Sequence, residues 1–234
     1  MSDLQNGLRA AASGGPGDIG DRGDRGDAGD TGGDGAGTQR APRGRKGERT
    51  RRRLLDAAEE NFAAIGFHDA SIVKITEAAG VAQGTFYLYF TGKQEIFDEV
   101  VADLNHRVRQ AMAEASAGAP DRLEAERRGF AAFFRFTAEH PALYQVMRQA
   151  EFVSPAAYRR HYERIVDGYL PSLRAAMEGG DVVAVDPEVL AWALGAIGEA
   201  VGMRWIVWTG ASEVPQEVFE AMMTLVARML GRGD

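Results

Sequence analysis

The sequence contains no cysteine, only 8 prolines and no long uninterrupted apolar run. Without cysteine there can be no disulfide framework, thiolate metal site or cysteine nucleophile, so we expect a protein of a reducing compartment, the cytoplasm. A signal peptide or membrane span would need an apolar stretch that the sequence lacks, and we expect no membrane partner. The 234 residues, 45% of them apolar, can nevertheless bury the core of one large domain or two small ones.

The net charge of −7 is unevenly distributed along the chain. Residues 1–39 carry 3 basic and 7 acidic residues, whereas residues 40–96 carry 10 basic and 7 acidic residues. The basic residues concentrate between Arg40 and Arg53. This run favours a polyanionic partner, and the alternative is a solvated basic linker that touches nothing.

Residues 1–47 hold 14 of the 29 glycines, and glycine recurs at every third position from Gly17 to Gly32. The repeat contains no proline and is too short for a collagen triple helix. We therefore expect a disordered tail rich in Gly, Asp and Arg.

From Glu48 onward the composition and spacing predict an all-α protein. Glycine and proline stops divide the chain into about nine helices, three short ones first and longer ones after. Their expected ranges are 48–65, 72–79, 83–89, 93–117, 121–139, 141–151, 155–178, 187–208 and 215–231.

The segment from Ser71 to Phe90 has the pattern of a helix-turn-helix. Ser71 can cap the first helix and Gly80 permits a left-handed turn. Phe86 and Tyr89 can pack back on the first helix, which leaves a polar face outward. In such motifs the second helix enters the major groove of DNA.

Thr50 to Phe97, 48 residues of the chain, resembles the DNA-binding domain of the tetracycline-repressor (TetR) family of bacterial regulators. The residues that carry the resemblance are Leu55-Asp56-Ala57-Ala58, Phe62, Gly66-Phe67, Ala79-Gly80-Val81, Gly84-Thr85, Phe86, Tyr87, Tyr89, Phe90 and Lys93. Two positions depart from the family pattern: Ala82 stands where a serine cap is common, and Thr76 replaces the usual alanine.

The resemblance implies a helix-turn-helix DNA-binding domain at 48–96 and a ligand-binding and dimerisation domain at 97–234. It also implies a homodimeric transcriptional regulator that binds a palindromic DNA operator and is released by a small-molecule effector. Repression is the expected outcome, with activation as the alternative. The residues expected at the DNA are Thr50, Arg51, Lys74, Gln83, Gly84, Thr85, Tyr87, Tyr89 and Lys93.

Residues 97–234 contain no catalytic motif, phosphate loop or metal-ligand pattern, so we expect neither an enzyme nor a cofactor. Aromatic and methionine stripes on amphipathic helices fit either a core or an apolar ligand cavity. An Arg148 facing the cavity would suit an anionic apolar ligand, such as a fatty-acyl compound, with Glu151 beside it. The expected ligand-binding residues are Phe130, Phe134, Tyr144, Met147, Arg148, Glu151, Phe152 and Tyr162.

The last two helices carry apolar stripes that could form a four-helix bundle across a two-fold axis. The expected dimer interface comprises Leu194, Ile197, Val201, Trp205, Phe219, Met222, Val226 and Met229. Two rival functions stay open. One is an all-α small-molecule enzyme or carrier, and the other is a nucleoid-type protein that binds DNA without regard to sequence.

Overall fold

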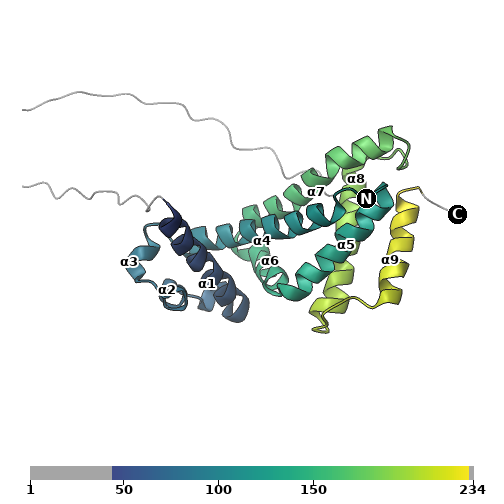
Figure 1. Cartoon of the computed structure of the whole chain (residues 1–234). Coiled ribbons are helices and arrows are strands. Elements are labelled where there is room, and N and C mark those ends of the chain that lie inside the picture. Colours follow the sequence, from purple (N-terminus) through teal and green to yellow (C-terminus); the bar gives the residue numbers. More distant parts are fainter. Residues whose placement is uncertain (1–43, 232–234) are drawn as a thin grey trace, which may run out of the picture. The chain divides into compact units, whose positions relative to one another are not determined.

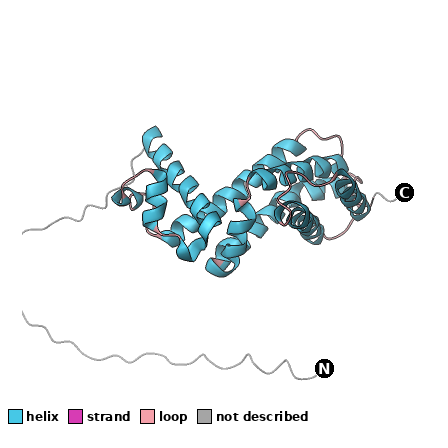
Figure 2. Cartoon of the chain, turned by 90° about the horizontal axis from the view of Figure 1, so that it is seen from below, coloured by secondary structure: helices cyan, strands magenta, loops and turns pink. Residues whose placement is uncertain are grey.

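The computed structural model describes residues 44–231. Within these residues the chain forms nine α-helices and one π-helical turn, with no strand, which confirms the all-α prediction (Figures 1 and 2). The helices are α1 (Arg45–Asp69), α2 (Ile72–Ala79), α3 (Gln83–Phe86), α4 (Lys93–Ser116), α5 (Arg122–Glu139), α6 (Ala142–Val153), α7 (Pro155–Glu178), α8 (Pro187–Gly202) and α9 (Gln216–Met229), with the π-helical turn at Met203–Val207. The predicted tail lies outside the described residues up to residue 43, as do Arg40 and Arg43 of the basic run.

Local signals fix most helix ends where the sequence predicts them. The Ser71 hydroxyl accepts a hydrogen bond from the Lys74 backbone N–H and caps α2, and Gly80 ends α2 with φ 61° in the left-handed region. Gly66 has φ 81° and breaks the helical path of α1, after which one further turn runs to Asp69. The predicted end of the first helix therefore marks a kink.

The helix predicted at 187–208 changes from α-helical to π-helical geometry before it ends. Its α-helical part stops at Gly202 and the π-helical turn continues to Val207. The stretch Pro187–Val207 is long and apolar enough to cross a membrane by length and composition alone. Its residues Leu190, Ala191 and Leu194 are buried in the core, so we interpret it as a core helix.

The N-terminal helices share one core with α4 and α6. Phe62, Ile75, Phe86 and Phe97 are all fully buried there, and the rings of Phe62 and Phe97 meet edge to face at 5.1 Å. Buried side chains of α6, such as Val146, belong to the same cluster. The described residues fall in one compact unit, and the boundary expected near residue 96 stays a prediction.

A second core lies between α5, α7, α8 and α9, around Leu173, Leu194, Met223 and Leu230. The long helix α4 packs on α1 at its start and on α5 and α7 further along. Helix α4 therefore connects the N-terminal helices to the C-terminal helices.

Candidate DNA interface and effector cavity

Helix α3 and Tyr87, which follows it, present a polar face to solvent. Phe86 is buried with 0% exposure, whereas its neighbour Tyr87 is 54% exposed and meets the Phe86 ring edge to face with ring centres 5.4 Å apart. Gln83 and Gly84 are exposed and Thr85 is half-buried. This arrangement agrees with the predicted division between packing and outward-facing residues.

Gly84 leaves free space on this face, since a Cβ built there would meet no protein atom within 4 Å. Tyr89 packs its half-buried ring against the N-terminal core. An exposed surface with a missing side chain lets a large rigid partner approach the backbone closely.

Helix α3 is shorter than predicted, because it ends at Phe86 instead of residue 89. After Thr85 the chain tightens: the Leu88 and Tyr89 N–H groups bond to carbonyls three residues earlier, at 3.3 and 2.9 Å. At the N-terminal end of α3 Ala82 provides no side-chain cap, because its methyl side chain cannot accept a hydrogen bond. The reading face is therefore held mainly by the packing of Phe86 and Phe90.

Three of the predicted phosphate-binding residues lie on α1 and α2. Lys74 is exposed and donates from Nζ to the Asp69 carbonyl at 3.0 Å. The Thr50 hydroxyl donates to the Lys46 carbonyl at 3.1 Å. Both side chains are engaged only locally, and their role at DNA stays a prediction.

Arg51 points toward α4 in this conformation. Its Nη2 lies 2.8 Å from Glu99 Oε2, and its guanidinium stands 5.4 Å from the centre of the Phe90 ring. About two fifths of each charged side chain is exposed, so the pair is weak and can exchange for a phosphate.

Lys93 lies at the start of α4, as predicted, and its ammonium bonds to backbone carbonyls near the end of α1. Its ammonium donates to the carbonyls of Phe67, His68 and Ala70 at 2.6, 3.3 and 2.8 Å, and it lies 4.4 Å from the Phe67 ring centre. An ammonium has three N–H donors, and all three are used here. In this structure Lys93 satisfies the carbonyls that the Gly66 kink leaves open, and it ties the end of α1 to the start of α4.

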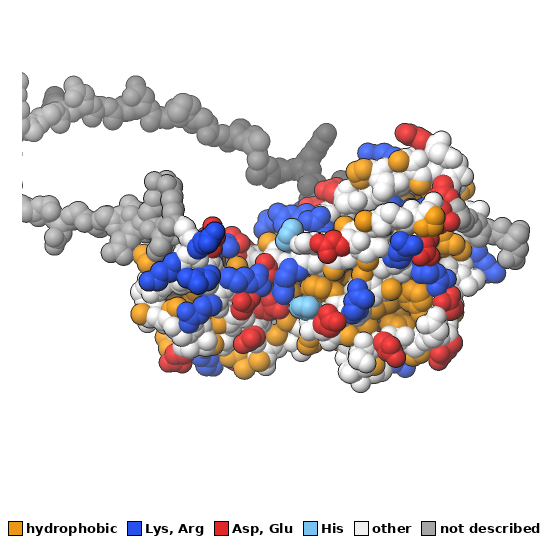
Figure 3. Space-filling view, in the orientation of Figure 1, with side chains coloured by type: hydrophobic (Ala, Val, Ile, Leu, Met, Phe, Trp, Pro, Cys, Tyr) orange, Lys and Arg blue, Asp and Glu red, His pale blue; other side chains and the backbone are white. Residues whose placement is uncertain are grey.

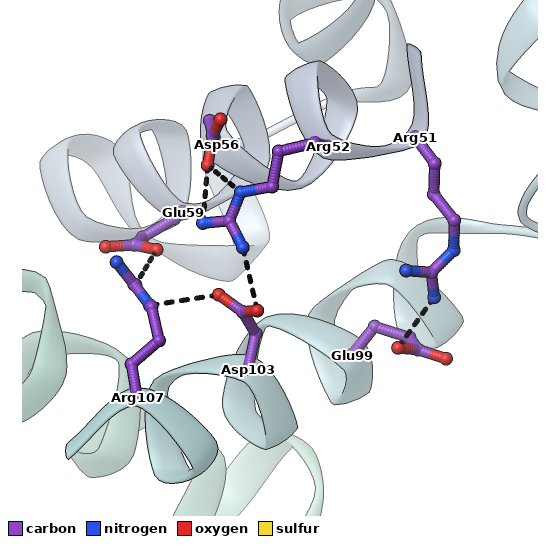
Figure 4. Close-up of polar contacts among 7 residues, drawn as sticks. All are labelled: Arg51, Arg52, Asp56, Glu59, Glu99, Asp103 and Arg107. Carbon is purple, nitrogen blue, oxygen red and sulfur yellow. Dashed lines mark hydrogen bonds and ion pairs between the residues drawn. The ribbon is translucent and has the colours of Figure 1, made fainter. Parts of the chain in front are cut away.

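An ion-pair network that the sequence analysis did not single out joins α1 to α4 (Figure 4). Arg52 contacts Asp56 on its own helix and donates from Nη1 to Asp103 at 2.8 Å. Arg107 lies 3.0 Å from Asp103 through Nε and also pairs with Glu59. Burial raises the pKa of Glu59, and the Arg107 guanidinium opposes that rise. The i,i+4 spacing of Asp103 and Arg107 was the available signal for this network.

A cavity of about 160 Å³ lies among α4, α5, α6, α7 and α8. Its wall is mostly apolar, with Val108 and Met112 from α4 on one side and Gly195 from α8 on another. Of the eight residues predicted to bind a ligand, four line this cavity: Phe130, Tyr144, Met147 and Tyr162.

The other four predicted ligand residues lie elsewhere. Phe134 is buried but packs against Phe219 in the C-terminal core. Arg148 and Glu151 are exposed on α6, and Phe152 is 82% exposed. Arg148 and Glu151 do not line the cavity, so the structure does not bring them to the ligand site predicted for them. Helical spacing puts them on the same stripe of α6 as Tyr144 and Met147, but both side chains are exposed.

Glu199 and two tyrosines supply polar groups of the cavity wall. The Tyr162 hydroxyl donates to Glu199 Oε1 at 3.0 Å, and the Tyr144 hydroxyl donates to the Glu199 backbone carbonyl at 2.9 Å. Burial raises the pKa of both phenols, with the nearby Glu199 carboxylate adding to the rise. Both tyrosines are therefore neutral hydrogen-bond donors at pH 7.

His161 connects the cavity wall to α4. Its Nδ1 lies 2.9 Å from Asn105 Nδ2, which also donates to the His161 carbonyl at 2.9 Å, and Arg109 donates from Nε to Asn105 Oδ1 at 3.0 Å. Burial, helped by the Arg109 charge, lowers the pKa of His161 to about 4. The imidazole is therefore neutral at pH 7, and any ligand that displaces it moves a group bonded directly to α4.

The residues predicted for a dimer interface divide into two groups. Leu194, Val201, Met222 and Val226 are at most 9% exposed because they form the core of the protomer, so they have little surface to bury on a partner. Ile197, Trp205, Phe219 and Met229 are partly exposed. The first group serves the protomer core, because both helices are apolar on more than one face, and its role at an interface stays a prediction.

Other apolar side chains on the same helices face outward. Val189 of α8 is 67% exposed and Leu225 of α9 is 53% exposed, whereas Trp192, which is 44% exposed, lines the cavity and stacks on Tyr162. In Figure 3 hydrophobic side chains gather over the C-terminal helices between the places of α5 and α9, while Lys and Arg side chains gather over α1. Exposed apolar patches of this kind mark protein interaction sites.

Comparison with known proteins identifies the N-terminal helices. The family model described as bacterial regulatory proteins, tetR family, matches residues 54–100. The uncharacterized HTH-type transcriptional regulator YdgC of Bacillus subtilis is 48% identical over 65 residues, which cover 28% of this chain and 33% of that protein. YhgD of the same species is 24% identical over 145 residues, 60% of this chain and 76% of that protein. The first match therefore spans about a third of its relative.

The fold also resembles solved structures over most of the described residues. The fatty acid degradation regulator FadR from Bacillus halodurans superposes with a TM-score of 0.68 at 20% identity, covering 79% of this chain and 96% of that chain. At this identity the likeness concerns the arrangement of helices.

Proposed function

We propose that the chain is a regulator of the tetR family, whose model matches residues 54–100, and that it acts as a repressor that binds a palindromic operator as a homodimer. A small, largely apolar molecule enters the cavity and releases the protein from DNA. Its relatives are transcriptional regulators, so catalysis is not part of the proposal. The protein works in the bacterial cytoplasm, where the operator lies.

The observation that carries the proposal is that α4 contacts both functional parts. Its start packs on the N-terminal core through Ile96 and Phe97, and its later residues Val108 and Met112 line the cavity. A ligand that changes the position of α4 therefore changes the position of the recognition helix. The ligand must bind the DNA-incompetent arrangement more tightly, since otherwise it shifts no equilibrium.

The exposed surface of α3 supports DNA recognition. Gln83 and Tyr87 extend from a helix whose other side is locked into a core, so their positions are preorganised for base edges. Thr85 and Lys74 flank them and suit backbone phosphates. Arg51 joins them when its weak pair with Glu99 opens.

The dimer uses the outward apolar surface of α8 and α9. Val189 on α8 and Leu225 on α9 would be covered by the same residues of a second copy. This surface replaces the buried residues of the original prediction. Two recognition helices about 34 Å apart would then meet successive major grooves of a palindrome.

The proposal is tested by fluorescence anisotropy of the purified chain on labelled DNA from upstream of its own gene. The expected result is a marked preference over scrambled DNA of the same composition and weaker binding as salt rises. Equal affinity for the two duplexes would contradict a specific regulator and favour a sequence-indifferent binder. No binding to either at low salt would favour the small-molecule enzyme or carrier.

A matched pair of exposed aromatic residues sharpens this test. Tyr87→Ala should weaken binding to the upstream DNA by roughly tenfold, because one base or backbone contact is worth about 1–3 kcal/mol. Phe152→Ala, on the far end of α6, should leave the affinity unchanged. Equal effects of the two substitutions would remove Tyr87 from the recognition surface.

A further inference from the structure

The charge of the cavity wall indicates which chemical class of ligand it accepts. We propose that the cavity binds an organic cation, a quaternary or protonated amine with an aromatic or compact apolar body, and that Glu199 is its counter-ion. This inference rests on the proposed function only in treating the cavity as the effector site.

Glu199 is the one Asp, Glu, Lys or Arg among the residues that line the cavity. None of the ion pairs found in residues 44–231 includes it. Its carboxylate receives one hydrogen bond, from Tyr162, and has further lone pairs free. Glu199 is partly exposed, and no basic side chain of the wall stands beside it, so a bound cation would supply its counter-charge.

The second titratable group of the wall does not compensate for Glu199. His161 is 7% exposed, and burial lowers its pKa to about 4, so it carries no charge at pH 7. The cavity therefore has a net negative wall. An anionic ligand would meet the carboxylate without any basic side chain to pair with, and Arg148 is exposed on the outer face of α6.

Aromatic rings stand beside the carboxylate. The Tyr162 ring stacks with Trp192 at 5.9 Å and 23°, and it meets Tyr158 and His161 edge to face, each with ring centres 5.0 Å apart. The electron-rich faces of tyrosine and tryptophan attract cations, most strongly where water is excluded. A carboxylate next to stacked aromatic rings is a suitable environment for an ammonium group with alkyl substituents.

The space available sets the size of the ligand body. Gly195 lies on the cavity-lining face of α8 between Trp192 and Glu199, and a Cβ built there would meet nothing within 4 Å. A cavity of about 160 Å³ has room for a substituted ammonium group with one ring.

The experiment compares three probes of similar size by isothermal titration calorimetry on the full chain. Benzyltrimethylammonium is the cation, neopentylbenzene is its uncharged carbon isostere, and 3-phenylpropanoate is the anion. The expected order is cation, then isostere, then anion, with the cation at least roughly tenfold tighter than the isostere. An isostere or anion that binds as tightly as the cation, or a cation that does not bind at millimolar concentration, would overturn the inference.

Two substitutions assign the preference to its residue. Glu199→Gln keeps the shape and the Tyr162 hydrogen bond, and it should weaken cation binding by about 10- to 100-fold while the isostere binds as before. Glu151→Gln removes a carboxylate from the exposed face of α6 and should change neither. An unchanged cation affinity in Glu199→Gln would overturn the inference. If Glu199→Gln does not fold, the ranking of the three probes on the wild type still tests the inference.

DNA binding is measured separately, so the two proposals can fail independently. A cation that binds in the calorimeter without weakening DNA binding would support the ligand class and contradict the release step of the proposed function. An anion that binds more tightly than the cation and releases DNA would support the release step and overturn the ligand class.

Discussion

Two glycines on α8 allow one substitution to be compared in two environments. Gly195 and Gly198 both lie in the helix interior and both line the cavity. Replacing either by alanine should gain about 1 kcal/mol from helix propensity and from reduced freedom of the unfolded chain. Because this gain is shared, the difference between the two variants reports only what the new methyl group touches.

The new methyl group meets different surroundings at the two positions. At Gly195 a Cβ would have no neighbour within 4 Å, whereas at Gly198 it would lie 2.7 Å from Phe130 Cε1 and 3.1 Å from Cδ1. Carbon atoms rest at about 3.5–4.0 Å, so the Phe130 ring would have to move by about 1 Å. That ring is 2% exposed, and overpacking of this kind costs about 1–3 kcal/mol.

Gly195→Ala should therefore be more stable than Gly198→Ala by about 1–3 kcal/mol, with Gly195→Ala above the wild type. Urea unfolding followed by far-UV circular dichroism, at one protein concentration for all three proteins, measures the difference. Equal free energies of unfolding for the two variants would refute the close approach of α5 to α8. A less stable Gly195→Ala would refute the open space in front of Gly195.

Two further predictions concern the polar contacts of α4. Between pH 7 and pH 5 the free energy of unfolding of the wild type should fall by about 2 kcal/mol more than that of His161→Gln, because the unfolded imidazole takes up a proton below its ordinary pKa near 6.5 while the buried one, with a pKa of about 4, does not. Parallel pH profiles from urea titrations would show that His161 is not buried in its neutral form. Asp103→Asn should lower the free energy of unfolding by about 1–2 kcal/mol, because Arg52 and Arg107 lose a shared carboxylate. Asp167→Asn, on the exposed face of α7, should leave the free energy of unfolding unchanged in the same urea titrations.

Local signals made the N-terminal helices predictable from sequence. Ser71 and Gly80 fix the ends of α2 through contacts within a few residues, and the spacing of Phe86 and Tyr87 decides which ring turns inward. These features depend on short-range geometry that the sequence contains directly. Lys93 shows the limit: it lies at the predicted helix start, but its ammonium bonds to carbonyls that only the folded end of α1 brings near.

The cavity was harder to predict because it depends on how whole helices rotate against one another. On α6 one stripe carries Tyr144, Met147 and Arg148, and packing buried the first two while Arg148 stayed exposed. On α8 every face is apolar, so burial of Leu194 could not be told apart from an interface role. The signal for Glu199 was a carboxylate far from the first turn of α8, where the neighbouring residues are apolar or small.

The central claim is that occupancy of the cavity sets the affinity for DNA. Gly195→Met tests it without a known ligand, because a flexible side chain attached at this position fills the open space from within. By anisotropy on the upstream duplex, Gly195→Met should bind roughly fivefold or more weakly than the wild type, and Gly195→Ala should match the wild type. A folded Gly195→Met that binds this duplex as tightly as the wild type would contradict the account.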